Sequence, residues 1–392
     1  MDYNPFLPEV RENPYPYYAY LQEHAPVYQV PDVGLWAITR YEDVLFILKN
    51  PQIFSASIMV AAMTGGLNPF TPEAPPMLSI DPPDHTRLRK LANRAFTPRR
   101  VASLERHIRE VTQHLIEPIA AQGECDLTRD LAIPLPVIVI AELLGVPPER
   151  YTDFRRWAND QARATLPDNS AEDQAEIRQG FAEFRAYFQE MIAAYRRQPQ
   201  DNFICDLVRA EEENQTLSAE EVLSMAQFVL LGGAETTTNL IGNAMIALCD
   251  HPEQLALIQA NPALAPQLVE ETLRYQSPIQ WLIRQATQDV ELSGTTVPAG
   301  AVILTMYGAA NRDPRKFSEP DKFNILRHAE GQLAFGFGIH FCLGAQLARL
   351  EAKVALEMLL GRFSRFTRTE AQVTWTESAM VRGPKTLPLI VA

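Results

Sequence analysis

The longest periodic stretch of the sequence, residues 218–250, is the feature that most limits the fold. It opens with Ser218-Ala-Glu-Glu221, a capping box in which the serine and the glutamate exchange hydrogen bonds at a helix start. At about 1.5 Å per residue, a helix of this length crosses a whole domain. Its apolar content predicts that it is buried. We therefore expect a fold organised around one long central helix.

The remaining patterns predict shorter helices and a few strands around that helix. Residue 81 is expected to cap one helix, with Pro82 at its first position. Residues 55–79 are rich in Pro, Gly and Met without a period, and we read them as a long loop. Helices are expected over 15–24, 41–49, 82–95, 98–121, 136–145, 149–165, 171–197, 252–259, 263–276 and 343–360. Strands are expected over 27–30, 35–39, parts of 279–306 and the last 30 residues. The expected fold class is mainly α with a minor β region, in a single domain spanning 1–392.

Charge and cysteine content limit the setting of the protein. Lys plus Arg is 35 and Asp plus Glu is 48, so the formal net charge is −13, which argues against nucleic acid as the main partner. The four cysteines form no C-x-x-C pair, so a disulfide framework is not expected. Residues 1–10 do not read as a signal peptide, and no apolar run reaches the roughly 18 residues of a membrane span. We expect a soluble, cytoplasmic protein.

The segment Phe335-Gly-Phe-Gly-Ile-His-Phe-Cys342-Leu-Gly344 is the most informative for function. Glycines before and after Cys342 allow positive φ and close approach of the backbone. A helix is predicted directly after Cys342, and a helix N-terminus lowers the pKa of a thiol. The segment therefore suits a thiolate that binds a soft metal centre. The alternative is a buried structural cysteine beside a turn.

The pattern F-G-x-G-x-H-x-C-x-G resembles the haem-ligand signature of the cytochromes P-450, and every fixed position of it is present. The resemblance covers roughly residues 10 to 390. It implies the cytochrome P-450 fold, with a long central helix over the haem. It also implies that Cys342 is the axial ligand of haem b (iron protoporphyrin IX) and that its electron donation favours O–O cleavage. Phe335, Gly336 and Gly344 would contact the cofactor.

The centre of the long helix reads Gly232-Gly-Ala-Glu-Thr-Thr237. Two adjacent glycines inside a helix cost about 1 kcal/mol each relative to alanine, so a sequence selected for stability alone would avoid them. The motif resembles the family's acid–alcohol pair. Glu235 would relay protons and Thr236 would hold dioxygen and its water by hydrogen bonds. Gly233 would let a flat cofactor approach the backbone, and the alternative is close helix packing against the glycines.

Two further sets of residues match the family in the expected order. Glu271 and Arg274 form an E-x-x-R pair on one helix face, and the resemblance adds Arg327 as the third member of a structural triad. The alternative for the E-x-x-R pair is a solvated surface pair. The residues that resemble the family's propionate donors are His85, Arg89, Arg284 and His340. Arginine suits carboxylates because its guanidinium is a planar fork; here the alternative is a solvated basic face.

The resemblance implies a monooxygenase that inserts one oxygen atom from O₂ into a lipophilic small molecule, by hydroxylation or epoxidation. The substrate would be a terpenoid, steroid, fatty acid or macrolide-like product, as in secondary metabolism. The expected pocket residues are apolar: Ile58, Met63, Val229, Ile279, Trp281 and Met380. Two alternatives stay open, namely a haem-thiolate peroxygenase or isomerase and a non-catalytic haem protein that binds gas.

Electrons must come from separate partners, because no flavin or iron–sulfur domain is visible in the sequence. We expect a ferredoxin or flavodoxin with its reductase, and a monomeric enzyme. A docking face is predicted where basic residues gather without acidic ones: Arg87, Arg89, Lys90, Arg94, Arg99 and Arg100. Arg349 and Lys353 could extend it.

Overall fold

The computed structural model describes residues 2–64, 67–166, 169–212, 215–370 and 372–392. The chain divides into two compact units. Unit 1 contains residues 1–55, 105–135 and 236–392, and unit 2 contains residues 56–104 and 136–235. The fold is mainly α with a minor β region, as the sequence predicts. A single catalytic domain over 1–392 stays a prediction.

The main sheet of unit 1 has the strand order β1-β2-β10-β7-β3. β10 runs parallel to β2, and the other neighbours are antiparallel. The strands are β1 (Val27–Gln29), β2 (Trp36–Ile38), β3 (Phe54–Ser55), β7 (Leu282–Ala286) and β10 (Val302–Thr305). Ile38, Phe54 and Ile303 from these strands share a buried core with Val44 of the next helix, α3. This core fixes β7, which carries Arg284.

Unit 1 also contains a β-hairpin and a second, smaller sheet. β8 (Val290–Leu292) and β9 (Thr295–Val297) form a hairpin whose turn is Ser293-Gly294. Both turn residues have positive φ, so the predicted turn is confirmed. A second sheet has the order β11-β12-β4 and joins β4 (Glu124–Asp126), β11 (Phe366–Arg368) and β12 (Pro388–Val391).

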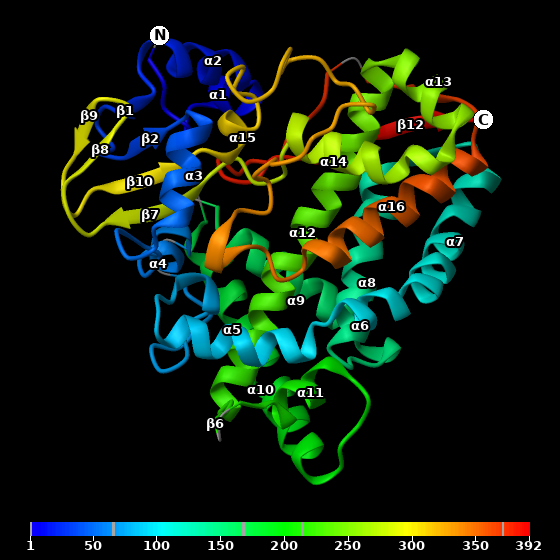
Figure 1. Ribbon diagram of the computed structural model, residues 1–392. Coiled ribbons are helices and arrows are strands. Elements are labelled where there is room, and N and C mark those ends of the chain that lie inside the picture. The colour runs from blue at the N-terminus through cyan, green and yellow to red at the C-terminus, as the bar shows by residue number, and fades with distance from the viewer. Residues whose placement is uncertain (1, 65–66, 167–168, 213–214, 371) are drawn as a thin grey trace. The chain divides into compact units, whose positions relative to one another are not determined.

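The helices of unit 1 include α16, which follows the segment that carries Cys342. α16 packs against α7 and α14, and these helices lie side by side in Figure 1. The helices are α1 (Pro8–Glu12), α2 (Tyr15–His24), α3 (Tyr41–Lys49), α7 (Glu105–Gln122), α13 (Pro252–Ala260), α14 (Ala265–Tyr275), α15 (Tyr307–Ala310) and α16 (Ala345–Arg362).

Unit 2 is built mainly from helices. α9 and α10 pack together through Trp157, whose ring contacts that of Phe184 at 5.6 Å. The helices are α4 (Met59–Thr64), α5 (Asp84–Ala95), α6 (Pro98–Ser103), α9 (Tyr151–Arg163), α10 (Ala171–Arg197) and α11 (Phe203–Arg209). β5 (Glu211–Glu212) pairs with β6 (Gln215–Thr216).

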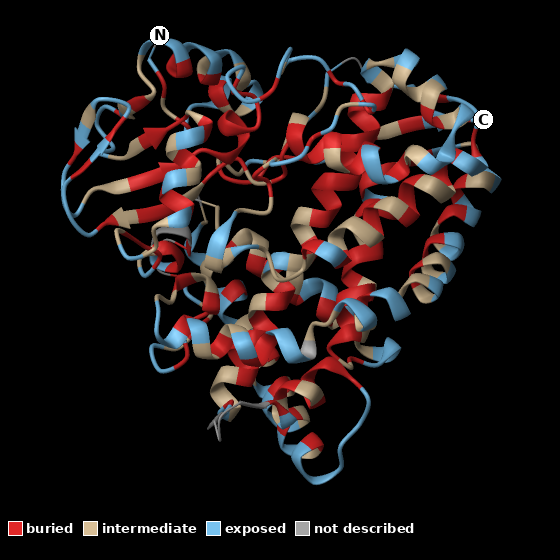
Figure 2. Ribbon diagram, in the orientation of Figure 1, coloured by how far each residue is buried: buried red, intermediate tan, exposed pale blue. Residues whose placement is uncertain are grey.

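Two helices continue from one unit into the other: α8 (Pro134–Leu143) and α12 (Ala219–Asp250). α12 is the predicted long helix, and it is buried along most of its length (Figure 2). The capping box is confirmed, because the Glu221 backbone N–H donates to the Ser218 hydroxyl at 3.1 Å and the Ser218 N–H donates to the Glu221 carboxylate at 2.8 Å. No helix in the described part of the chain is long and apolar enough to cross a membrane.

Some predicted boundaries were wrong for local reasons. The predicted helix over 98–121 is two helices, α6 and α7, separated at Leu104. The predicted loop over 55–79 contains α4 and a 3-10 turn at Met77–Ser79. Residue 81 does not cap α5, which begins at Asp84. The carboxylate of Asp81 instead accepts a hydrogen bond from the Ala56 backbone N–H at 2.9 Å. This bond joins the two ends of the segment 56–81.

Candidate haem site

A backbone hydrogen bond holds Cys342 in the loop that precedes α16. The Cys342 N–H donates to the carbonyl oxygen of Phe335 at 2.9 Å, which closes the loop between them. Gly338 has φ +71°, and a Cβ there would lie 2.6 Å from the Leu48 carbonyl oxygen, so the loop needs glycine at this position. The half-buried Cys342 is thus held in a loop that approaches the end of α3 closely.

α16 begins two residues later than the sequence predicts. Gly344 is its N-cap, and Ala345 is the first helical residue. Cys342 therefore precedes the N-cap by two positions. It still lies next to the unpaired N–H groups of a long helix, which favour the thiolate form.

Arg349, one turn into α16, was not expected to act on the cysteine loop. Its guanidinium carbon lies 4.4 Å from the centre of the Phe335 ring, and its nitrogens pair with the carboxylate of Glu270 on α14. This stack supports Phe335 from the side of α16. No motif in the sequence pairs Arg349 with Glu270, because 79 residues separate them.

Arg284 and His340, two predicted propionate partners, both belong to unit 1. Arg284 is buried on β7, opposite Ile303 of β10, and His340 is half-buried in the turn Gly338–His340. Tyr307 of α15 lies near the charge of Arg284 and near the loop that carries His340. Its hydroxyl would lie 3.8 Å from a Cβ at Gly336. Burial raises the pKa of this hydroxyl, and the positive charge of Arg284 acts against that rise. Sequence reasoning missed Tyr307, which no family motif marks.

The other two predicted propionate partners lie in unit 2, on α5. His85 is buried and Arg89 is half-buried. Their i,i+4 spacing puts both side chains on one face of the helix. The backbone N–H of His85 donates to the carbonyl of residue 81 at 3.1 Å, which fixes the first turn of α5.

The two adjacent glycines in the middle of α12, Gly232 and Gly233, have different surroundings. A Cβ at Gly233 would lie 2.7 Å from the Ile140 side chain of α8, so Gly233 allows close helix packing. A Cβ at Gly232 would meet no atom within 4 Å. The open side of α12 is therefore at Gly232, one turn before Thr236, while the predicted contact of Gly233 with the cofactor stays a prediction.

Glu235 and Thr236 are adjacent and both half-buried. Protein surrounds the Glu235 carboxyl closely enough that burial raises its pKa to about 7. The next turn is fixed in place, because the Thr238 hydroxyl donates to the Ala132 carbonyl at 2.9 Å. The pair thus combines a hydroxyl with an acid that both gains and loses its proton near neutral pH.

The three residues of the predicted triad come together in unit 1. Glu271 and Arg274 are fully buried and joined by two hydrogen bonds of 2.8 and 2.9 Å. The Arg327 guanidinium reaches Glu271 at 3.2 Å. A fourth donor, the Asn324 backbone N–H at 2.9 Å, was not predicted. The network therefore ties α14 to the segment that precedes the cysteine loop.

The predicted pocket residues divide between the units. Ile279, Trp281 and Met380 belong to unit 1, where Ile279 pairs with Val381 in a β-bridge and Trp281 and Met380 are buried. In unit 2, Ile58 is half-buried and Val229 is buried. The side chain of Met63 lies outside the described residues.

The residues of unit 1 fit a haem on two observations of this structure. Cys342 precedes the N-terminus of a long helix, and Arg284 is a buried arginine on β7. The cysteine supplies a soft ligand for iron, and the guanidinium supplies a cation for a carboxylate.

Comparison with known proteins identifies the family. The family model for cytochrome P450 matches residues 259–391. The vitamin D(3) 25-hydroxylase of Pseudonocardia autotrophica is 39% identical over 386 residues, covering 96% of this chain and 94% of that protein. The structure of cytochrome P450 CYP109Q5 from Chondromyces apiculatus is 42% identical, covers 100% of this chain and 98% of that one, and gives a TM-score of 0.94.

A third similar protein is CYP109E1 from Bacillus megaterium, solved in complex with testosterone. It is 33% identical, with a TM-score of 0.87 over 96% of this chain and 99% of that one. Identity of this level over nearly the whole length shows common family membership. The chain therefore belongs to the cytochrome P450 family, and it is a haem-thiolate monooxygenase.

Proposed function

We propose that this monooxygenase hydroxylates or epoxidises a lipophilic molecule of steroid size, with haem b as its cofactor and a ferredoxin or flavodoxin as its electron donor. Two similar proteins support the substrate class. One is named vitamin D(3) 25-hydroxylase, and the structure of the other was solved in complex with testosterone. The apolar character of Val229, Trp281 and Met380, all buried, agrees with it.

The haem supplies the activation of O₂ at an iron whose electron density is raised by a thiolate. In this chain Cys342 would hold the iron. Arg284 and His340 from unit 1, and His85 and Arg89 from unit 2, would hold the propionates, because guanidinium and imidazole groups donate to carboxylates. Phe335, stacked under Arg349, keeps the loop of Cys342 in place.

The observation that carries the proposed chemistry is the pKa of Glu235, about 7, beside the hydroxyl of Thr236. An acid transfers protons most efficiently when its pKa lies near the working pH. Glu235 would take protons from solvent and deliver them toward the reacting oxygen. Thr236 would orient that oxygen by a hydrogen bond. A peroxygenase needs no such delivery, so this pair favours an O₂-dependent reaction.

The first experiment is the absorption spectrum of the dithionite-reduced protein under carbon monoxide, for wild type and Cys342→His. We expect a strongly red-shifted Soret band that the variant loses. A band typical of histidine ligation in the wild type would contradict the proposed role of Cys342.

The second experiment measures coupling with a surrogate ferredoxin, its reductase and testosterone. Thr236→Ala should keep the carbon monoxide band but divert reducing equivalents into peroxide, and Thr237→Ser is the matched control. Unchanged coupling in Thr236→Ala would contradict proton delivery by this pair.

The electron donor would dock on α5 and α6. Within unit 2, Arg87 pairs with Glu221 and Arg100 pairs with Asp206. Three others, Lys90, Arg94 and Arg99, are exposed. In unit 1, Arg349 pairs with Glu270, and Lys353 lies 3.4 Å from Glu105 and 3.5 Å from Glu357.

Charge reversal tests this docking site. The double variant Arg94→Glu/Arg99→Glu should slow reduction of the haem by an acidic ferredoxin and weaken its dependence on salt. Arg129→Glu, an exposed arginine of unit 1, is the control. If the double variant and the control variant Arg129→Glu were reduced at the same rate, docking at α5 and α6 would be contradicted.

A further inference from the structure

Residues 374–385, here called the C-terminal hairpin, carry one of the predicted pocket residues, Met380. The two arms of the hairpin pair through the Thr376 N–H to Gly383 carbonyl bond at 2.9 Å and the Lys385 N–H to Thr374 carbonyl bond at 2.7 Å. The tip of the hairpin is held by Ser378, whose hydroxyl accepts from the N–H groups of Met380 and Val381.

The hairpin also pairs with the strand-like segment 278–280. The Gln280 N–H donates to the Met380 carbonyl at 2.8 Å, and the Arg382 N–H donates to the Pro278 carbonyl at 2.7 Å. Ile279, a second predicted pocket residue, lies between these two bonds and forms a β-bridge with Val381. A displacement of the hairpin backbone would therefore move Met380 and Ile279 together.

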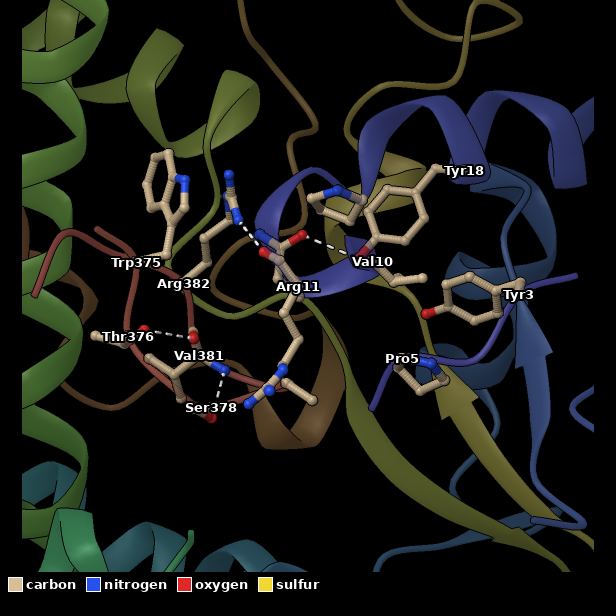
Figure 3. A pocket seen from close by; sticks show the side chains of 13 residues that line it. Tyr3, Pro5, Val10, Arg11, Tyr18, Trp375, Thr376, Ser378, Val381 and Arg382 are labelled. Carbon is tan, nitrogen blue, oxygen red and sulfur yellow. Dashed lines mark hydrogen bonds between the residues drawn. The ribbon is translucent and has the colours of Figure 1, made fainter. Parts of the chain in front are cut away.

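Two arginines join the hairpin to α1 in opposite directions. The Arg382 guanidinium donates to the carbonyl oxygens of Arg11 and Glu12, the latter at 2.9 Å. In return, the Arg11 guanidinium donates to the carbonyl oxygen of Glu377 in the hairpin. Figure 3 shows the two side chains passing each other, Arg382 toward the backbone of α1 and Arg11 toward the tip of the hairpin. The carbonyls of Arg11 and Glu12 end α1 and have no partner within that helix.

Arg382 is held in a way that suits arginine alone. Only 6% of it is exposed, and its guanidinium carbon lies 3.6 Å from the centre of the Trp375 ring. Among the described residues, no carboxylate forms an ion pair with it. The charge is thus stabilised by two carbonyls and an aromatic face, which suits the planar guanidinium and not the compact ammonium of lysine.

The space between α1 and the hairpin is too small for a ligand. The cavity there, lined by Tyr18, Gln280, Trp375 and both arginines, measures about 20 Å³. A single water needs about 10–15 Å³, so nothing larger than one or two waters fits. The contact is therefore a packed junction that fixes two backbone segments relative to each other.

We propose that Arg11 and Arg382 form a reciprocal clasp that positions Met380 and Ile279, and that these two arginines are remote determinants of substrate selectivity. The inference rests on the proposed function, together with the prediction that Met380 and Ile279 line the substrate pocket. Opposite the clasp, Asn243 of α12 donates to the Arg382 carbonyl at 3.0 Å. Loss of the clasp thus frees one side of the hairpin and leaves the other attached.

The test compares two azoles that ligate haem iron, bulky clotrimazole and small imidazole, by spectral titration. In Arg382→Met, we expect the clotrimazole Kd to rise about tenfold or more, because a misplacement of about 1 Å caused by a remote mutation can cost up to about 100-fold. The imidazole Kd should stay within about twofold of wild type, as for an independent site. The carbon monoxide band should be unchanged.

Conservative variants separate positioning from general stability. Arg11→Lys should bind clotrimazole nearly as wild type does, because a single hydrogen bond to Glu377 needs one donor. Arg382→Lys should remain impaired, because it loses two carbonyls and the stack on Trp375. The double variant Arg11→Met/Arg382→Met should be less impaired than the sum of the single variants, since both side chains hold the same junction.

Met380→Ala reports on the proposed pocket, and Arg129→Met is the matched surface control. If Met380→Ala alters the clotrimazole Kd but Arg382→Met does not, the clasp is overturned and the pocket stands. If Met380→Ala has no effect, the proposed pocket itself fails. Equal losses for both azoles together with a lost carbon monoxide band would also overturn the clasp, because Arg382 would then only maintain the fold.

Discussion

The network around Glu271 and the middle of α12 each place a glutamate inside a helix, in opposite surroundings. Glu271 accepts hydrogen bonds from Arg274, Arg327 and the backbone N–H of Asn324. Among the described residues, Glu235 has no such set of donors, and burial raises its pKa to about 7. The first carboxylate is fully satisfied and fixes chain segments, whereas the second is prepared to exchange a proton. Among the described residues, the two glutamates therefore differ in the donors around them.

The largest expected effect comes from removing the charge of Glu271. Glu271→Gln leaves the guanidiniums of Arg274 and Arg327 without their counter-charge, and breaking a buried pair costs about 3–5 kcal/mol of unfolding free energy. Urea unfolding and the yield of protein with the carbon monoxide band measure the loss. The neighbouring Glu270→Gln, which breaks a half-buried pair with Arg349, should cost about 1 kcal/mol or less. Equal losses of unfolding free energy in Glu271→Gln and Glu270→Gln would contradict the difference between the buried and the half-buried pair.

Glu235→Gln should lower coupled turnover about 100-fold, since general acid catalysis contributes effects of this order. Product formation with testosterone measures this change, while the carbon monoxide band should remain. Glu220→Gln is the matched control, because Glu220 lies in the first turn of the same helix and is a half-exposed partner of Arg185. A similar loss in the control variant would contradict a specific role for Glu235.

The pKa of Glu235 also predicts a pH dependence of stability. Its pKa is raised from 4.5 to about 7 in the folded protein, so the folded state binds more protons than the unfolded state between these values. The unfolding free energy should therefore fall as pH rises from about 4.5 to about 7 and then level off. Glu235→Gln should remove about 1–3 kcal/mol of this decline. An unchanged pH profile in urea unfolding would contradict the raised pKa.

The adjacent glycines Gly232 and Gly233 of α12 provide a sharper test of the open side. Gly233→Ala should cost about 1–3 kcal/mol of unfolding free energy, because its Cβ meets Ile140. Gly232→Ala should be neutral or stabilise the haem-free protein by up to about 1 kcal/mol, because its Cβ meets nothing and alanine favours helix. Chemical unfolding of both variants measures the difference. Equal destabilisation by the two substitutions would contradict the open surroundings of Gly232 and the close packing at Gly233.

The smallest effect is expected at the edge of the Glu271 network. Arg327→Lys should cost about 1 kcal/mol, because lysine cannot reach both Glu271 and the carbonyls of Ser318 and Glu319, while Arg274 stays in place. Arg315→Lys, at a half-exposed side chain, is the control and should leave the midpoint of urea unfolding unchanged. A cost as large as that of Glu271→Gln would mean that Arg327 carries the network.

The elements defined by local pattern could be predicted from the sequence. The capping box at Ser218 and Glu221 marks the start of α12, and the expected range 171–197 is the observed α10. The glycines around Cys342 indicated a tight loop before a helix, and the E-x-x-R spacing indicated the pair of Glu271 and Arg274. Each of these depends on residues within a few positions, where helix periodicity and turn chemistry decide the structure.

Only the tertiary structure decided which distant groups meet. Arg11 and Arg382 are 371 residues apart, and Arg349 and Glu270 are 79 apart. The open side at Gly232 and the packed side at Gly233 depend on where α8 crosses α12. The backbone N–H of Asn324 became a partner of Glu271 only because the loop folds back on α14. Such contacts follow from how packed elements close upon each other, and no local propensity encodes them.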